Sequence, residues 1–380
     1  MKNKLIEILW SRYQKFTSLP ALVFGDRKIT YQTLINDICR GILYLEQHNI
    51  INKKIAYFTD FADYDQIISV LCTSIVSQKN ANYFWTKPLG QLLKDIKTED
   101  SWDAIIVPHS KWNDVKDYQD LVPNNFWMNL TKKFSHEEIH EIFNKYDDNN
   151  CVVGVSSSGS SKPNTHWTYH TIDEIINATK PFKQLLYNGQ RIMRCAYIAL
   201  SDPFQLLSVW FSPWVKVSTL WCFAINDKVL WQNGFFENFI KENRINYMLT
   251  ITSNLFEANR FMSEIEIIHL RSINDKNDEY IKQLINNGCK YINLLASSEY
   301  LIQMISVVEK NNLANFGWFN VFGSDYQIDK TTGELSWLYK NHFYKTGDIF
   351  EEYNKKIRWL GRTNGIQFGM KLKEKQYDAK

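Results

Sequence analysis

The chain has 380 residues, and its 44% hydrophobic and 15% aromatic content is typical of a folded globular protein rather than a disordered one. The 44 basic and 41 acidic residues give a formal net charge of +3, which argues against nucleic acid or a membrane as a partner. The sequence has no C-x-x-C pair and no apolar run of about eighteen residues, so we expect a soluble cytoplasmic protein.

The sequence alternates between helical and β patterns as far as residue 298. Residues 1–20 predict an amphipathic helix, followed by two short strands around a Gly25-Asp26 turn and by a helix to Leu45 with Thr30 as its N-cap. Further strands are expected at 53–60, 102–110, 151–158, 194–200, 217–223, 246–252, 266–273 and 290–298. Further helices are expected at 64–78, 135–145, 171–187, 203–214, 234–242, 253–262 and 276–287. This alternation predicts an α/β fold with layered, mainly parallel sheets covered by helices.

The pattern changes at Gly317. The stretches YQIDKTTGELSW and YKTGDIFEEYNKKIRWLGR place Gly and Thr at turns between alternating apolar residues. Such spacing predicts a small antiparallel β meander over about residues 317–363.

The stretch from His136 to His140 fits the H-E-x-x-H pattern, which on a helix can hold zinc. The alternative is structural, because Ser135 followed by Glu138 three residues later makes a capping box at the start of a helix. No third ligand is evident nearby in the sequence. We therefore favour the helix start.

A serine-rich loop follows the strand expected to begin at residue 151. Its core is Ser157, Ser158, Gly159, Ser160 and Ser161. Consecutive backbone N–H groups and hydroxyls of this kind can donate hydrogen bonds to phosphate oxygens. The same composition is also common in ordinary turns between a strand and a helix. The local chemistry leaves both interpretations open.

Three further polar positions lie beside expected strands. Asp348, in a strand-end turn within YKTGD, could accept hydrogen bonds from two ribose hydroxyls or be an ordinary turn residue. Arg362, in LGRTN, could bind a phosphate or carboxylate or be a surface arginine that closes a hairpin. Ser298 and Glu299 end the strand pattern at 290–298, where Glu299 could hold Mg²⁺ or the pair could begin a helix.

Taken in order, these segments resemble the adenylate-forming superfamily, which includes acyl- and aryl-CoA synthetases, luciferases and the adenylation domains of peptide synthetases. LPALVFGDRKITYQTLINDI is similar to the family's opening segment, and DDNNCVVGVSSSGSSKPNTHWTYH is similar to its phosphate loop. LRSINDKNDEYIKQLINNGCKYINLLASSE is similar to a strand–helix–strand segment of the family. TTGELSW, YKTGD and WLGRTN follow in the family's order, so the resemblance covers about residues 19–370.

The resemblance implies a site for ATP or AMP and Mg²⁺. The loop at residues 157–161 would cradle the ATP phosphates. Glu299 would hold Mg²⁺, and Ser298 would contact the α-phosphate. Asp348 would bind the ribose hydroxyls, and Arg362 would lie at the edge between ribose and phosphate.

The resemblance also places a substrate pocket and a hinge. Asp202 and Phe204 lie in the segment that corresponds to the family's substrate-pocket helix. Asp202 would pair with an α-ammonium group or cap a helix before Pro203, and the aromatic residues from 204 to 221 would line an apolar pocket or form plain core. Asn364 falls where the family has a hinge aspartate between its large and small domains.

Some positions depart from the family pattern. Asn164 replaces the lysine of the phosphate loop, and Leu295 and Ala296 replace an aromatic residue and a glycine beside the adenine. We expect residues 1–363 to be the large N-terminal domain and residues 364–380 to be the hinge and a truncated stub. The small C-terminal lid domain, which carries the family's catalytic lysine, is then expected to be missing.

The resemblance implies AMP-forming activation of a carboxylic acid, in which a carboxylate attacks the α-phosphorus of ATP and pyrophosphate leaves. An amino, aryl or fatty acid would be the substrate, with a carrier protein or a separate lid domain as a partner. Two alternatives stay open. The chain would otherwise be a non-catalytic scaffold on the same fold, or an enzyme that transfers acyl groups without ATP.

Overall fold

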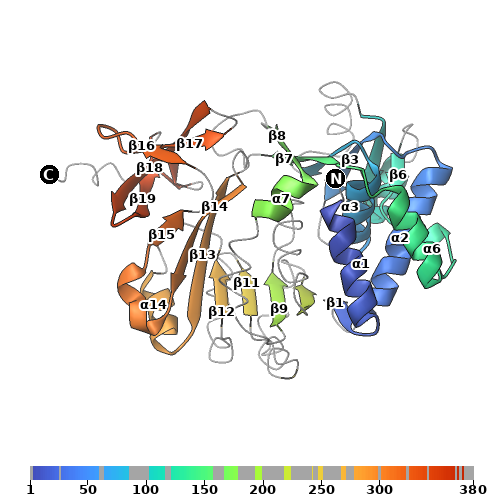
Figure 1. Ribbon diagram of the computed structural model, residues 1–380, viewed down its shortest axis with the longest axis horizontal. Helices are drawn as coiled ribbons and strands as arrows, with labels where there is room; N and C mark the ends of the chain where they lie inside the picture. The colour runs from blue at the N-terminus through green and yellow to red at the C-terminus, as the bar shows by residue number, and fades with distance from the viewer. Residues whose placement is uncertain are drawn as a thin grey trace. The chain divides into compact units, whose positions relative to one another are not determined.

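The computed structural model describes residues 3–24, 27–59, 64–84, 102–115, 121–156, 167–178, 193–198, 218–223, 242, 247–250, 267–270, 278–297, 301–321, 325–339, 342–363, 366–367 and 370–371 (Figure 1). The chain divides into two compact units. Unit 1 comprises residues 1–156 and 167–227, and unit 2 comprises residues 157–166 and 228–380.

Unit 1 begins as the sequence predicts. Helix α1 (Lys4–Phe16) is followed by the antiparallel strands β1 (Pro20–Phe24) and β2 (Arg27–Thr30). Helix α2 (Tyr31–Gln47) begins where the Thr30 hydroxyl accepts a hydrogen bond from the Thr33 N–H at 3.1 Å. The expected N-cap is therefore confirmed.

The main sheet of unit 1 has six strands in the order β6-β5-β3-β4-β7-β8. Its strands are β3 (Lys54–Thr59), β4 (Lys79–Phe84), β5 (Ala104–Val107), β6 (Leu121–Pro123), β7 (Val152–Ser156) and β8 (Trp167–Thr171). All neighbours are parallel except β7 and β8. The mainly parallel sheet is confirmed, whereas the strands β4, β6 and β8 were not predicted from the sequence.

Helices and short turns connect these strands. They are α3 (Tyr64–Val76), η1 (His109–Lys111), α5 (Trp112–Val115), η2 (Phe126–Asn129), α6 (His136–Lys145) and α7 (Ile172–Ala178). Strand β10 (Ser218–Phe223) pairs in parallel with both β1 and β9 (Met193–Ile198). The helix expected at 171–187 is described only as far as Ala178, and the helix expected at 203–214 lies outside the described residues.

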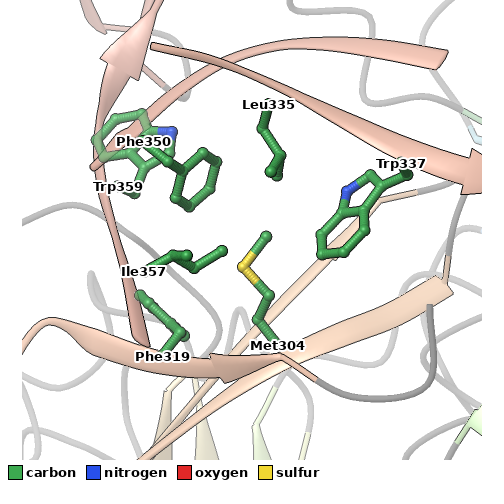
Figure 2. Packing of buried hydrophobic residues seen from close by; sticks show 7 residues of the cluster. All are labelled: Met304, Phe319, Leu335, Trp337, Phe350, Ile357 and Trp359. Carbon is green, nitrogen blue, oxygen red and sulfur yellow. The ribbon is translucent and has the colours of Figure 1, made fainter. Parts of the chain in front are cut away.

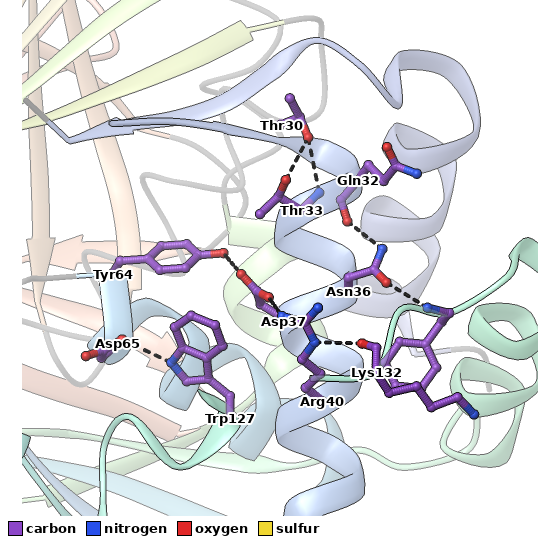
Figure 3. Close-up of polar contacts among 11 residues, drawn as sticks. Thr30, Gln32, Thr33, Asn36, Asp37, Arg40, Tyr64, Asp65, Trp127 and Lys132 are labelled. Atoms are coloured by element: carbon purple, nitrogen blue, oxygen red, sulfur yellow. Dashed lines mark hydrogen bonds and ion pairs between the residues drawn. The ribbon is translucent and has the colours of Figure 1, made fainter. Parts of the chain in front are cut away.

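A buried polar cluster joins α2 to α3, as Figure 3 shows. Asp37 is 2% exposed, and its two carboxylate oxygens accept hydrogen bonds from Arg40 Nη1 and from the Tyr64 hydroxyl, each at 2.7 Å. Arg40 Nε also donates to the Lys132 carbonyl at 2.7 Å. Burial raises the pKa of Asp37, although the Tyr64 hydrogen bond and the Arg40 charge act in the opposite direction. We call Asp37, Arg40 and Tyr64 the Asp37 cluster.

Unit 2 starts with the parallel strands β11 (Tyr247–Thr250), β12 (Ile267–Leu270) and β13 (Lys290–Ser297). Helix α14 (Asp278–Asn286) lies between β12 and β13 in the chain, as the sequence predicts. Strand β14 (Leu301–Val308), which the sequence analysis missed, pairs antiparallel with β13. The helix expected at 253–262 and most of the one expected at 234–242 lie outside the described residues.

The predicted β meander is confirmed. After η5 (Lys310–Asn315) come β15 (Trp318–Val321), β16 (Tyr326–Ile328), β17 (Glu334–Tyr339), β18 (His342–Tyr353) and β19 (Lys356–Arg362). Their order is β16-β17-β18-β19-β15-β14, and every pairing is antiparallel. Two short strands, β20 (Ile366–Gln367) and β21 (Met370–Lys371), form a separate pair.

The meander surrounds one apolar core, which Figure 2 shows from close by. Its members, called the meander core below, are Met304, Phe319, Leu335, Trp337, Phe350, Ile357 and Trp359. Each is at most 7% exposed. Alternation along β19 brings Ile357 and Trp359 to this core while Arg358 and Leu360 stay exposed, as expected for strands with one covered face.

Among the described residues, no helix combines the length and the apolar character needed to cross a membrane.

Candidate functional site

Asp348 lies in the middle of strand β18. The expectation that it follows a strand end is wrong, because β18 continues from His342 to Tyr353. The strand is nevertheless distorted there. Gly347 has a φ of +73°, which glycine adopts at no steric cost. The register with β17 shifts between Glu334 and Ser336, whose partners are Ile349 and Lys345, so the β18 residues from Thr346 to Asp348 lie opposite Leu335 alone. A local bulge therefore presents Asp348 from within a strand.

Side chains on both sides hold this bulge. The Thr346 hydroxyl accepts a hydrogen bond from the Asp348 N–H at 3.0 Å and donates to the Leu335 carbonyl at 2.9 Å. Glu334 Oε1 accepts from the Gly347 N–H at 3.2 Å. The second Glu334 oxygen lies 3.1 Å from Lys345 Nζ, which is largely exposed. The backbone beside Asp348 is thus tied to β17 through two independent side chains.

The Asp348 carboxylate is half-buried and contacts the meander core. Its Oδ1 accepts a hydrogen bond from the indole nitrogen of Trp359 at 3.1 Å. Trp359 was not among the residues predicted to form the site. The signal available was the alternation in KIRWLGR, which places Trp359 on the covered face of β19 but does not say which residue of β18 it meets.

Arg362 is the last residue of β19, and its Cα is the direct cross-strand partner of Asp348. The structure therefore brings together the backbones of these two predicted site residues, which are fourteen positions apart in the sequence. The side chain of Arg362 lies outside the described residues.

The serine-rich loop connects two strands. Ser156, the last residue of β7, pairs with Trp167, the first residue of β8, so the residues before and after the segment 157–166 belong to two adjacent antiparallel strands. The interpretation of this segment as a turn between a strand and a helix is wrong at that point, since α7 begins only after β8. Ser157, Ser158, Gly159, Ser160 and Ser161 themselves lie outside the described residues.

The remaining predicted residues are placed only by their neighbours. Ser298 and Glu299 fall in the short connection between β13 and the antiparallel strand β14, and Ser297 pairs with Leu301. The alternative in which they begin a helix is wrong, because the chain continues as a strand. Both residues, together with Asp202, Phe204 and Asn364, lie outside the described residues.

The H-E-x-x-H stretch forms the start of α6. Ser135 and Glu138 make the reciprocal hydrogen bonds of a capping box, which confirms the structural interpretation. The rings of His136 and His140 both contact Trp10 of α1, with centroids at 4.6 and 5.1 Å. These histidines therefore lie exposed at the surface, with their rings against Trp10. In the described part of the chain, no group of three or more potential metal ligands comes together.

No protein-family model and no curated protein sequence matches the chain. Solved structures are similar to it. O-succinylbenzoate coenzyme A synthetase (MenE) from Bacillus subtilis, in complex with AMP, has a TM-score of 0.72 and 14% identity over 96% of this chain and 100% of that chain. The N-terminal subdomain of Klebsiella oxytoca NpsA, in complex with anthranilyl-AMSN, has a TM-score of 0.69 and 14% identity over 94% and 99%.

A third similar structure is McyG A-PCP complexed with phenylalanyl-adenylate, with a TM-score of 0.74 and 11% identity over 98% of this chain and 68% of that chain. The three neighbours hold AMP, anthranilyl-AMSN and phenylalanyl-adenylate, respectively. At such low identities the similarity establishes the architecture of the chain. The chain therefore shares the fold of these three structures.

Proposed function

We propose that this chain binds an adenine nucleotide and supports AMP-forming activation of a carboxylic acid. The observation that carries the proposal is the similarity over nearly the whole chain to a synthetase domain that holds AMP. Asp348 supports it independently. A half-buried carboxylate at a strand bulge, with an arginine at the opposite backbone position, suits the hydroxyls of a ribose next to a phosphate.

In the proposed reaction, a carboxylate oxygen of the acid attacks the α-phosphorus of ATP, the bond to the bridging oxygen breaks, and pyrophosphate leaves with acyl-AMP as the product. Catalysis of such a step is mostly positioning and neutralisation of charge. We assign the phosphates to the loop at residues 157–161, the ribose to Asp348 and the ribose–phosphate edge to Arg362.

We further propose that Glu299 holds Mg²⁺ with Ser298 near the α-phosphate, and that Asp202 and Phe204 contact the acid. Residues 1–363 would act as the large domain, with a hinge at Asn364. The neighbours include McyG A-PCP and an artificially fused adenylation-PCP di-domain, which supports a carrier protein as the acceptor of the activated acid. A separate small domain is the second partner that we propose.

The test is calorimetric titration of Mg-ATP and AMP into the wild-type chain and into Asp348→Ala. We expect micromolar binding to the wild type and a loss of about a hundredfold in the variant, because two hydrogen bonds to a charged group would be removed. Pyrophosphate exchange with a panel of amino, aryl and fatty acids then tests the chemistry. A wild-type chain that binds neither nucleotide would contradict the proposal.

A second candidate is a nucleotide-binding scaffold without turnover. It is favoured by Asn164, which stands where the superfamily has a loop lysine and so removes a cation from the proposed phosphate site. Nucleotide binding without pyrophosphate exchange for any acid, with or without added lid domain, would select this candidate. Exchange with any acid would exclude it.

A further inference from the structure

Trp359 connects the meander core to the carboxylate of Asp348. The Trp359 side chain is 7% exposed and packs among the residues of Figure 2, while its indole nitrogen lies 3.1 Å from Asp348 Oδ1. An indole nitrogen can donate a hydrogen bond but cannot accept one. Trp359 is therefore the donor of this hydrogen bond, and the Asp348 carboxylate is the acceptor.

The position of this donor is fixed as well. Phe350 and Ile357 belong to the same core, and close packing leaves a large planar side chain such as Trp359 one orientation. On the backbone side, Thr346 binds the Asp348 N–H. The Asp348 carboxylate thus accepts from Trp359 of the meander core, and the Asp348 backbone N–H donates to Thr346.

Orientation of the carboxylate matters for a vicinal diol. A carboxylate has about four acceptor positions, of which the indole uses one. Two neighbouring hydroxyls bind more tightly to a carboxylate whose plane is already set, because otherwise binding costs the ordering of that side chain. Binding of a sugar that lacks these hydroxyls does not depend on the orientation of the Asp348 carboxylate.

We propose that Trp359 is a positioning residue, which acts through Asp348 to make the site prefer a nucleotide with a ribose over the corresponding dideoxyribose nucleotide. This inference rests on the proposed function, since it requires that the sugar of a bound nucleotide meets Asp348. It adds a residue and a ligand preference to that function.

The experiment compares binding of AMP and of 2′,3′-dideoxy-AMP by calorimetry. The full-length chain is used as wild type, Trp359→Phe and Trp337→Phe. Trp337 is the matched control, because it is 3% exposed in the same core and contacts Tyr326. Its replacement removes the same volume without removing the hydrogen bond to Asp348.

We expect Trp359→Phe to weaken AMP binding about tenfold and to leave binding of the dideoxy nucleotide nearly unchanged, as loss of one hydrogen bond to a charged acceptor predicts. The preference for AMP then falls about tenfold, whereas Trp337→Phe keeps it. Replacement of Trp359 by 3-benzothienylalanine, which keeps the ring shape but lacks the N–H, should lower the preference equally with little loss of stability.

The outcomes separate the two proposals. A wild-type chain that binds AMP no better than the dideoxy nucleotide, or binds neither, overturns the ribose role of Asp348 and with it the role of Trp359. A wild type that prefers AMP supports the ribose role. If both Trp359 variants then keep that preference, or if Trp337→Phe loses it to the same extent, the positioning role alone is overturned.

Discussion

Asp37 in unit 1 and Asp348 in unit 2 are carboxylates that differ in exposure and in hydrogen-bond partners. Asp37 is 2% exposed, and side chains of its own unit donate to both of its oxygens. Asp348 is half-buried, stands at a bulge next to a glycine with positive φ, and receives an indole N–H from the core behind it. A carboxylate whose oxygens are both satisfied by side chains of its own unit is part of the internal hydrogen bonding of that unit, whereas one presented at a distorted strand is a candidate for function.

Matched substitutions of Asp37 and Asp348 test whether the two carboxylates differ in their contribution to stability. We expect Asp37→Asn to lower the free energy of unfolding by about 2 kcal/mol, because a carboxamide has one acceptor oxygen where the carboxylate accepts from both Arg40 Nη1 and the Tyr64 hydroxyl. Asp348→Asn, which keeps shape and polarity at a half-buried position, should lower it by less than about 1 kcal/mol. Urea unfolding of both variants and the wild type gives the values.

Nucleotide binding is the control for this pair. Asp348→Asn should lose affinity for AMP, and Asp37→Asn should keep it at temperatures where the variant is folded. Equal losses of stability in the two variants would contradict the division between a structural and a functional carboxylate.

The pH dependence of the free energy of unfolding gives a second, smaller measure of the environment of Asp37. Burial raises the pKa of Asp37 and of its neighbour Asp65 above the ordinary value of 3.8. The folded chain therefore keeps these protons at a pH where the unfolded chain has released them. Stability from this source is present below the unfolded pKa and is lost as the pH rises through the folded pKa.

Asp37→Asn removes the contribution of Asp37, so the free energy of unfolding of this variant should fall less steeply with pH than that of the wild type. The change in slope is at most about 1.4 kcal/mol per pH unit, the value for one proton. Urea unfolding of the two proteins between about pH 4 and pH 7 measures it. A steeper fall in the variant would show that the sign is wrong.

Much of the fold could be predicted from local patterns. The cap at Thr30 and the capping box at Ser135 are local features, and both are confirmed. Strand β4 escaped prediction because Lys79, Asn80 and Asn82 interrupt its apolar pattern. Asn80 is nevertheless fully buried, and its amide donates to the Ser74 hydroxyl of α3 at 3.3 Å. A tertiary contact of this kind has no local signature.

The site was predicted less completely. The position of Asp348 was singled out in the sequence, but its place within a continuous strand was not. The contact with Trp359 depends on the register between β18 and β19, which includes an irregularity after Ile349. The alternation of apolar residues predicts which face of a strand is covered. A bulge shifts the pairing between two neighbouring strands, so the residues that contact each other cannot be predicted from alternation alone.

The central claim is that Asp348 belongs to a nucleotide site in unit 2. The most direct measurement is a crystal structure of the chain grown with AMP. We expect the ribose hydroxyls within hydrogen-bond distance of the Asp348 carboxylate and the phosphate on the side of Arg362. AMP bound with its ribose away from Asp348, or a site that stays empty at saturating AMP, would contradict the claim.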